Sequence, residues 1–478
     1  MLTREEKLMD RSKKEELTMQ KAAADSAGNQ KISQNSKVLE QGSFWQLLLR
    51  LSLPAVVVIL IMLIYNMADT YFIGQTGDPN KISAISICMP VFTILSGIST
   101  LFGNGGCTTI SIALGEKDQS KISRITAFCG FGCLAIGLLE VVIVFCFAEP
   151  IVIFLGADAD TLADAVTYLR VFSFAGPFVL FANTYGSVAR ADGEAASAMI
   201  ANMAGSVSNI VLDALFILGF GWDVFGAALA TVLGNVIACI IIVRVIATKK
   251  AFLMPRLRSL TLRADIVVPV LTLGLPMTFS TLLSSISNTI SNRLMISHGS
   301  VCLAAQSVAG KLGMVITMLI MGVCMGLQPA ISYNYGSKNQ KRLFELLRQL
   351  ILFTVVLGIG LTAVIYFSKD MLIAAFIDNE EIIAYGRIFV LASVMVGPVY
   401  GLYQACQTFL QATGKVAYAI FASLLDKGLI YIPVLYLMNM KFGAYGIAFA
   451  HAVTLVFCII TILFLTLRWS RKIQAKKA

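Results

Sequence analysis

Long apolar stretches recur along this chain of 478 residues and constrain its fold more than any other feature. A helix of about 20 apolar residues crosses the hydrocarbon core of a bilayer, which is about 30 Å thick. Strands of a membrane barrel span about 10 residues and alternate in polarity, which these stretches do not. Only 13% of the residues are charged, against about a quarter in a soluble domain. The sequence therefore predicts an all-α polytopic membrane protein with twelve transmembrane helices. The predicted spans are 45–75, 82–111, 121–148, 162–189, 196–219, 225–247, 266–297, 302–334, 344–367, 382–412, 417–438 and 443–468.

The positive charges predict how these helices are oriented. If the N-terminus is cytoplasmic, 29 of the 37 Lys and Arg residues fall on the cytoplasmic side, 5 on the opposite side and three within spans. This bias follows the positive-inside rule. We therefore expect a cell (plasma or inner) membrane protein with both termini cytoplasmic, and the net charge of +10 reflects topology rather than nucleic-acid binding.

The chain also repeats itself. Residues 82–118 resemble residues 303–339 at an offset of 221, and weaker matches flank this block in the same order. Six helices per repeat is an even number, so both halves enter the membrane in the same sense. The sequence thus predicts two six-helix bundles related by a pseudo-two-fold axis along the membrane normal, an arrangement of transporters with a central site. The predicted parts are a polar tail (1–42), an N-terminal lobe (43–248), a basic loop (249–265), a C-terminal lobe (266–470) and a basic tail (471–478).

Two carboxylates in the first half have no acidic counterpart in the second. A charged side chain within a span costs about 2.5–3.5 kcal/mol on insertion scales, so it normally faces a cavity or a partner. Polar residues surround both, and oxygen ligands of this kind suit a small hard cation. Two carboxylates in one apolar pocket also titrate as a unit. We predict a site that loads a proton or Na⁺, although both acids could instead simply end their helices at the interface. The candidate ligands are Tyr65, Asp69, Asn183, Asn209, Asp213 and Thr231.

Several motifs together resemble the multidrug and toxic compound extrusion (MATE) family over roughly residues 43–470. They read "MADTYFIG", "ISAISICMPVFTILSG", "ISIALGEKD", "ARADGEAASAM", "NIVLDALFILGFGWDVFGAALAT" and "MGLQPAISYNYGSKN". The resemblance implies a secondary active antiporter with two bundles around a V-shaped cleft. In such a protein, inward movement of H⁺ or Na⁺ drives export of amphipathic, often cationic drugs. We expect a monomer in the lipid bilayer.

The resemblance is closest to the prokaryotic branch whose cation site lies in the N-terminal lobe. It assigns cation coupling to the six candidate ligands above, with Na⁺ a candidate at Asp69, Asp213, Asn209 and Thr231, and it implies no other metal and no cofactor. The predicted helices 7 and 10 carry no acid within their spans, which departs from the branch with a second-lobe site. Pro54 matches the proline at which helix 1 is proposed to bend, and a static kink is the alternative.

Three further polar residues are candidates for the substrate cleft: Glu140, Asn288 and Asp426. Glu140 could equally lie near the outer interface without a role. Asp426 and Lys427 are adjacent and are expected to point to different sides of their helix. Asp426 could then form a structural ion pair with Lys311 or Arg293 instead.

Other functions fit the sequence less well. A lipid-linked oligosaccharide flippase of the same superfamily would need a strongly basic cleft, and only three cations lie within spans. An intramembrane enzyme would need clustered acids or a histidine at the membrane interface. The sequence shows neither, so no catalytic residue is predicted. The chain contains no G-x-x-x-x-G-K-[ST] loop, so ATP is not the expected energy source.

Overall fold

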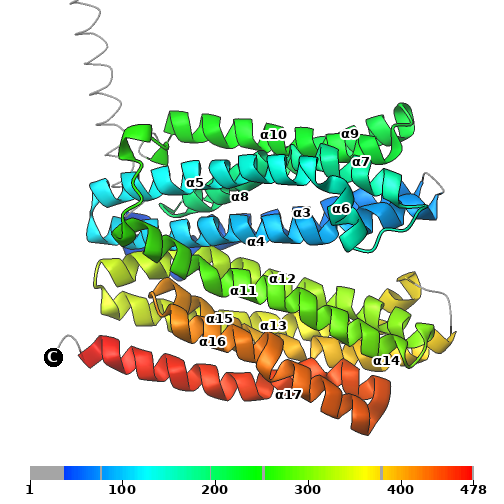
Figure 1. The fold of residues 1–478 in the computed structure, drawn as a ribbon. Coiled ribbons are helices and arrows are strands. Elements are labelled where there is room, and N and C mark those ends of the chain that lie inside the picture. Colours follow the sequence, from blue (N-terminus) through cyan, green and yellow to red (C-terminus); the bar gives the residue numbers. More distant parts are fainter. Residues whose placement is uncertain (1–36, 76–77, 194, 250–252, 377–379, 476–478) are drawn as a thin grey trace, which may run out of the picture.

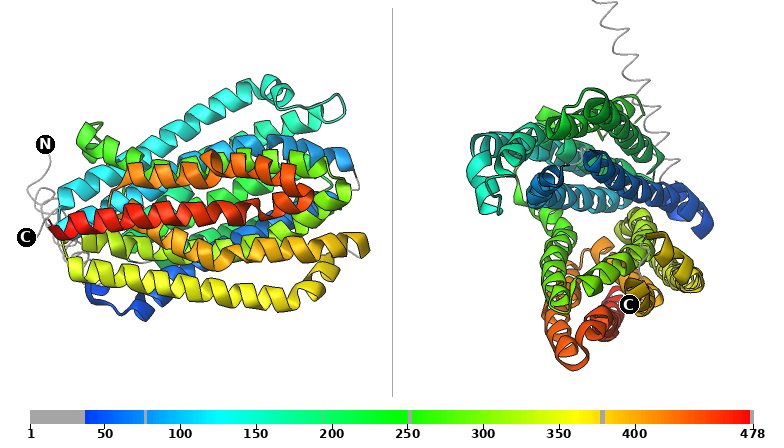
Figure 2. Two further views of the ribbon diagram at one scale, coloured as in Figure 1. Left: turned by 90° about the horizontal axis from the view of Figure 1, so that it is seen from below. Right: turned by 90° about the vertical axis from the view of Figure 1, so that its right-hand side faces the viewer.

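The computed structural model describes residues 37–75, 78–193, 195–249, 253–376 and 380–475. Within these ranges every regular element is a helix, and the long helices run roughly side by side (Figure 1). Seen along the helices, those before residue 250 and those after residue 263 form two bundles (Figure 2).

The first bundle holds the following helices, with η marking π- and 3₁₀-helical turns: α2 Phe44–Leu47, η1 Leu48–Ser52, α3 Leu53–Gly74, α4 Pro79–Glu116, α5 Gln119–Cys146, α6 Ala148–Phe154, α7 Leu162–Ser173, α8 Gly176–Arg190, α9 Ala195–Asp213, η2 Ala214–Gly219 and α10 Asp223–Lys249. The connecting loop holds η4 Leu257–Ser259. The second bundle holds α11 Ala264–Ile296, α12 Ser300–Gly336, α13 Gln340–Phe376, α14 Glu380–Val394, α15 Val396–Ala412, α16 Val416–Leu424, η5 Leu425–Leu429 and α17 Tyr431–Ala475.

These helices account for the twelve predicted spans. Ten are long and apolar enough to cross a membrane, and the pair α7–α8, bent by 51°, makes eleven in the described ranges. The last of the ten, Val416–Ala475, contains two spans because the backbone leaves the helical region at Gly443 (φ 56°, ψ −137°). The predicted multi-pass, all-α fold is therefore confirmed. The short helix α6 was not predicted.

Equivalent backbone turns confirm the internal repeat. Lys117 and Lys338, 221 residues apart, both end their helices in the left-handed region, at φ 61° and 58°. In each turn the next residue's N–H bonds back five residues, Asp118 to Ala113 (3.0 Å) and Asn339 to Asn334 (3.0 Å), as in a Schellman motif. Non-glycine residues at positive φ are uncommon, so their occurrence at equivalent positions supports the repeat.

Glycines bring the two bundles together in the same repeated way. A Cβ on Gly105 of α4 would overlap the carbonyl oxygen of Val270 on α11. A Cβ on Gly326 of α12 would overlap the backbone of Ser52 in η1. Gly105 and Gly326 are also 221 residues apart. In membranes, small residues of this kind allow helix backbones to approach closely.

The end of the predicted polar tail is packed rather than loose. Leu39 is fully buried, and its carbonyl accepts a bond from Asn334 Nδ2 on α12 (2.9 Å). The carbonyl of Gly42 accepts a bond from Arg342 on α13. Residues 37–42 therefore attach to the second bundle before the chain enters the first. Residues 1–36 lie outside the described ranges.

Candidate functional site

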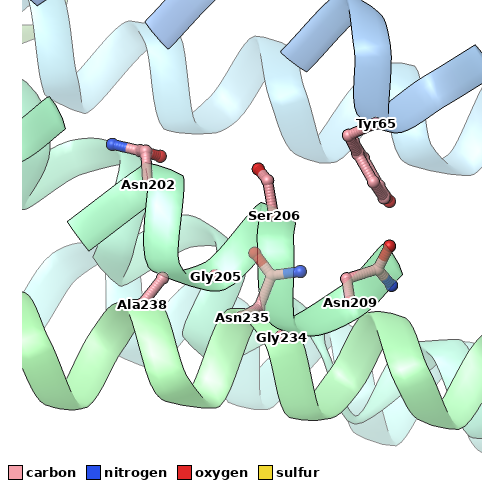
Figure 3. A pocket seen from close by; sticks show the side chains of 8 residues that line it. All are labelled: Tyr65, Asn202, Gly205, Ser206, Asn209, Gly234, Asn235 and Ala238. Carbon is pink, nitrogen blue, oxygen red and sulfur yellow. The ribbon is translucent and has the colours of Figure 1, made fainter. Parts of the chain in front are cut away.

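A small polar cavity of about 60 Å³ lies within the first bundle. Tyr65 reaches it from α3, and the remaining lining comes from α9 and α10 (Figure 3). Figure 3 shows the Tyr65 hydroxyl directed toward the Asn209 amide. The lining residues are Tyr65, Asn202, Gly205, Ser206, Asn209, Gly234, Asn235 and Ala238.

Close packing of α9 against α10 creates this cavity. A Cβ on Gly205 would lie 2.8 Å from Ala238 Cβ, and one on Gly234 would lie 2.8 Å from Asn209 Cβ. Because both positions are glycine, the two helices approach closely. That approach places Asn209 Nδ2 3.5 Å from Thr231 Oγ1 across the helix pair.

The polar residues of α9 form one stripe. Asn202, Ser206, Asn209 and Asp213 follow at spacings of four, three and four, which is one face of an α-helix. Asp213 is fully buried and is the last residue of α9. The chain then widens into the π-helical turn η2, a distortion that is frequent at functional sites.

Oxygen atoms are the groups this cavity offers to a ligand. The amide nitrogens of Asn202 and Asn235 donate to the carbonyls of Ala198 (2.9 Å) and Thr231 (2.8 Å) in their own helices. The amide oxygens remain as acceptors. Asn209 Oδ1 is buried and accepts no hydrogen bond from the described residues. Neutral oxygens near a buried carboxylate can accept a hydrogen bond from a protonated group, or can bind a small hard cation.

The structure brings together part of the predicted ligand set. Tyr65 and Asn209 line the cavity, and Thr231 bonds to Asn209. Asn183 lies half-buried on α8 and is not among the lining residues. The backbone of Asp69 is part of α3, but its side chain lies outside what the structure describes.

Sequence reasoning missed the three other polar residues that line the cavity: Asn202, Ser206 and Asn235. Their signal was available. Asn202 and Ser206 continue the stripe that ends at Asp213, and Asn235 stands four residues after Thr231.

Pro54 lies buried at the start of α3, directly after the π-helical turn η1. In that turn the Leu53 N–H bonds to the Leu48 carbonyl, one residue further back than in an α-helix. The wider turn accommodates the missing N–H and the ring of Pro54. A local change of helix geometry at this proline is present. Movement there remains a prediction.

The candidate cleft residues lie in three different environments. Asn288 is exposed on α11. Glu140 of α5 is half-buried, and its carboxylate packs against Gly176, at the break between α7 and α8. Both carboxylate oxygens are buried, and neither finds a hydrogen-bond partner in the described part of the chain.

Asp426 departs from the expected geometry. Its carboxylate lies 3.0 Å from the Nζ of the adjacent Lys427 and 3.3 Å from Nε2 of His451. The two neighbours therefore do not point to different sides, and Asp426 pairs with Lys427 and contacts the His451 ring rather than pairing with the expected Lys311 or Arg293. The cause is the π-helical turn η5, which rotates successive side chains by less than an α-helix does, together with the length of the lysine chain.

Comparison with known proteins agrees with this fold. A family model described as MatE matches residues 54–215 and again residues 276–437, which together exceed half of the chain. The multidrug export protein MepA of Staphylococcus saprophyticus is 29% identical over 439 residues, 92% of this chain and 97% of that protein. MepA of Staphylococcus aureus (strain NCTC 8325) is 29% identical over 422 residues, 88% of this chain and 92% of that protein.

A solved structure gives the same result for the fold. The outward-facing conformation of a multidrug resistance MATE family transporter of the MOP superfamily superposes with a TM-score of 0.86 at 20% identity. The alignment covers 91% of this chain and 98% of that chain. With the family model matched once in each half of its duplicated membrane fold, this chain belongs to the MatE family.

Proposed function

We propose that this protein is a secondary active exporter of small amphipathic, often cationic compounds, driven by inward movement of H⁺ or Na⁺. It would work in the cell membrane with both termini cytoplasmic. The similarity to two multidrug export proteins over nearly their whole length supports the export of drugs. The distribution of Lys and Arg supports the orientation.

The observation that carries this proposal is the polar stripe of α9, whose residues Asn202, Ser206 and Asn209 line the cavity and which ends one turn later at the buried Asp213. A fully buried carboxylate one turn from Asn209, which bonds to Thr231 and lines the cavity with Tyr65, is costly to insert and is expected to have a function. At the repeat offset of 221, the second lobe has Ile430 in place of Asn209 and Val434 in place of Asp213. The second lobe therefore has no acid or amide at the positions of Asn209 and Asp213.

Coupling follows from differential binding. A cation that binds one conformation better than the other shifts the population by the ratio of its affinities, and equal affinity shifts nothing. A proton or Na⁺ at Asp213 neutralises the buried charge at the end of the stripe that Tyr65 of α3 faces. Helix α3 can then repack against α9, with the turn at Pro54 absorbing the change. The drug binds the opposite state, so the ion gradient drives its release.

Dye transport in proteoliposomes tests the proposal. Asp213→Asn should retain the fold but lose gradient-driven efflux of an ethidium-like dye, because the amide can neither take up a proton nor neutralise a cation. Asp265→Asn makes the same chemical change at an exposed residue, 54% accessible, and should transport normally. Full transport by the Asp213 variant would refute the proposal.

Imposing the pH gradient and the Na⁺ gradient separately identifies the ion. Efflux under only one gradient assigns the coupling to that ion. Efflux under either gradient assigns both ions to the same site, provided that Asp213→Asn abolishes both activities.

A further inference from the structure

The second lobe contains a buried charged cluster that the proposed cation site does not use. Asp426 in η5 is 2% exposed, and its two oxygens have separate partners. Lys427 Nζ lies 3.0 Å from Oδ2, and His451 Nε2 on α17 lies 3.3 Å from Oδ1. The two partners also approach each other, because Lys427 Nζ lies 3.5 Å from His451 Nε2.

Local structure holds this cluster in place. The π-helical turn η5 directs both Asp426 and Lys427 toward α17. The Ser287 hydroxyl on α11 donates to the Lys427 carbonyl, fixing the turn from the other side. The ring of Tyr431 stands edge-on to the His451 ring, with centroids 5.8 Å apart.

One nitrogen of His451 cannot satisfy both neighbours in its neutral form. If Nε2 carries a hydrogen, it donates to Asp426 but presents a hydrogen to the Lys427 ammonium. If Nε2 is bare, it accepts from Lys427 but faces the carboxylate with its lone pair. An imidazolium keeps the bond to Asp426, and the cluster of one carboxylate and two cations then carries a net charge of +1. The number of protons on His451 therefore changes the hydrogen bonding of the whole cluster.

The other titratable groups near the Asp426 carboxylate are three tyrosines and a cysteine. Tyr400 and Tyr403 of α15, and Tyr431 and Cys458 of α17, interact electrostatically with Asp426. The Tyr403 hydroxyl donates to the Ala422 carbonyl (3.0 Å). These phenols and the thiol are neutral near pH 7. The group whose ordinary titration range coincides with physiological pH is His451.

The repeat places this cluster where the first lobe has its polar cavity. The segment "FGAALAT" (225–231) matches "YGIAFAH" (445–451), so His451 takes the position of Thr231. At the offset of 221, Asp426 takes the position of Gly205, which lines the cavity. A cavity of neutral oxygens in one lobe thus corresponds to a closed charge cluster in the other.

We propose that His451, held between Asp426 and Lys427, is a second proton-binding site, located in the C-terminal lobe. The site takes a proton and no metal ion, because Lys427 occupies the position at which a cation would meet the carboxylate. The inference rests on the proposed antiport and extends it, since each lobe then carries its own titratable group. Protonation breaks the contact between Lys427 and His451 and so changes how η5 packs on α17.

The two histidines of the chain make a direct test possible. The full-length protein, labelled on histidine and held in lipid nanodiscs, should give two imidazole signals, and His298→Gln assigns them. The His451 signal should change with pH between about pH 5 and 8, the range in which a histidine side chain ordinarily changes charge. In Asp426→Asn its proton affinity should fall by about tenfold or more, since an opposite charge at this distance shifts titration by about 1–3 units. His298, which contacts Asn439 Oδ1 at 2.6 Å, should be unaffected.

Two outcomes would overturn the inference. One is a His451 signal that does not change over this pH range. The other is an unchanged midpoint in a folded Asp426→Asn protein. If Asp426→Asn does not fold, Lys427→Met serves as the second variant. Removing the neighbouring ammonium should raise the proton affinity of His451. Efflux that depends on Asp213 while His451 does not titrate would overturn the second proton site but leave the proposed export function intact. Failure of this inference is therefore distinguishable from failure of the proposed function.

Discussion

The two lobes share a backbone and differ in the polar groups placed on it. Both break one long span at a glycine-proline pair, Gly176–Pro177 in the first lobe and Gly397–Pro398 in the second. In each lobe a glycine of the neighbouring helix allows the break to pack closely, Gly137 against Pro177 and Gly358 against Gly397. The side chain at the break is not the same.

In the second lobe the Thr362 hydroxyl contacts Gly397 and donates to the Val394 carbonyl (2.7 Å). In the first lobe the Glu140 carboxylate contacts the equivalent Gly176, and neither of its oxygens has a hydrogen-bond partner among the described residues. Duplication has therefore preserved the glycine-proline breaks, while the polar side chains of the two lobes have diverged. The polar cavity of the first lobe and the charge cluster of the second are the clearest cases.

Substitution of the glycines at the contacts between the lobes should cause the largest losses of stability, and the losses should be equal in the two lobes. Gly105→Ala and Gly326→Ala each force a methyl group into the opposing backbone, so each should destabilise the protein by about 1–3 kcal/mol. Apparent Tm in detergent measures this. Gly310→Ala and Gly360→Ala are matched controls with nothing within 4 Å, and they should be neutral or stabilising. A normal Tm for only one of the first two variants would show that the lobe contacts are not equivalent.

Substitutions at the two helix breaks should change the free energy of unfolding in opposite directions. Thr362→Val removes the bond to Val394 and should cost about 1 kcal/mol. Glu140→Gln supplies an N–H donor and removes a buried acid without a partner among the described residues, so it should stabilise by about 1 kcal/mol. Thermal unfolding at about pH 7.5 tests the pair. A loss of stability in the Glu140 variant would mean that its carboxylate is paired.

Replacing the equivalent serines of α4 and α12 with alanine should also have different effects on stability. Ser111 Oγ donates to the Ala191 carbonyl (2.9 Å), so Ser111→Ala should cost about 1 kcal/mol. Ser332, 221 residues later, is fully buried and its hydroxyl has no partner within the described ranges. Ser332→Ala should therefore leave the Tm unchanged or raise it. Equal losses at both positions would contradict this difference.

The smallest effect is expected at the two lysines with positive φ. Lys117→Gly and Lys338→Gly should each raise the free energy of unfolding by about 0.5 kcal/mol, because glycine adopts this conformation without steric cost. The gains should be equal in the two lobes. Denaturant or thermal unfolding of the single and double variants would reveal any inequality.

Much of this fold could be predicted because the bilayer demands long apolar helices, and the duplicated sequence fixes how they are grouped. The position of Asp213 could also be predicted, since a carboxylate inside a span is conspicuous. Asn202 and Asn235 were missed because a polar stripe does not reveal which neighbouring helix it faces. The partners of Asp426 were mispredicted because ideal helix spacing does not apply to the π-helical turn η5.

The attachment of residues 37–42 to α12 and α13 has a consequence for how the lobes separate. The chain crosses between lobes at this segment and again at the loop that leads into α11, and both crossings lie at the end of the molecule where α12 meets α13. These two covalent links limit separation at that end. The chain does not cross between the lobes at the opposite end, so the lobes can move apart more easily there.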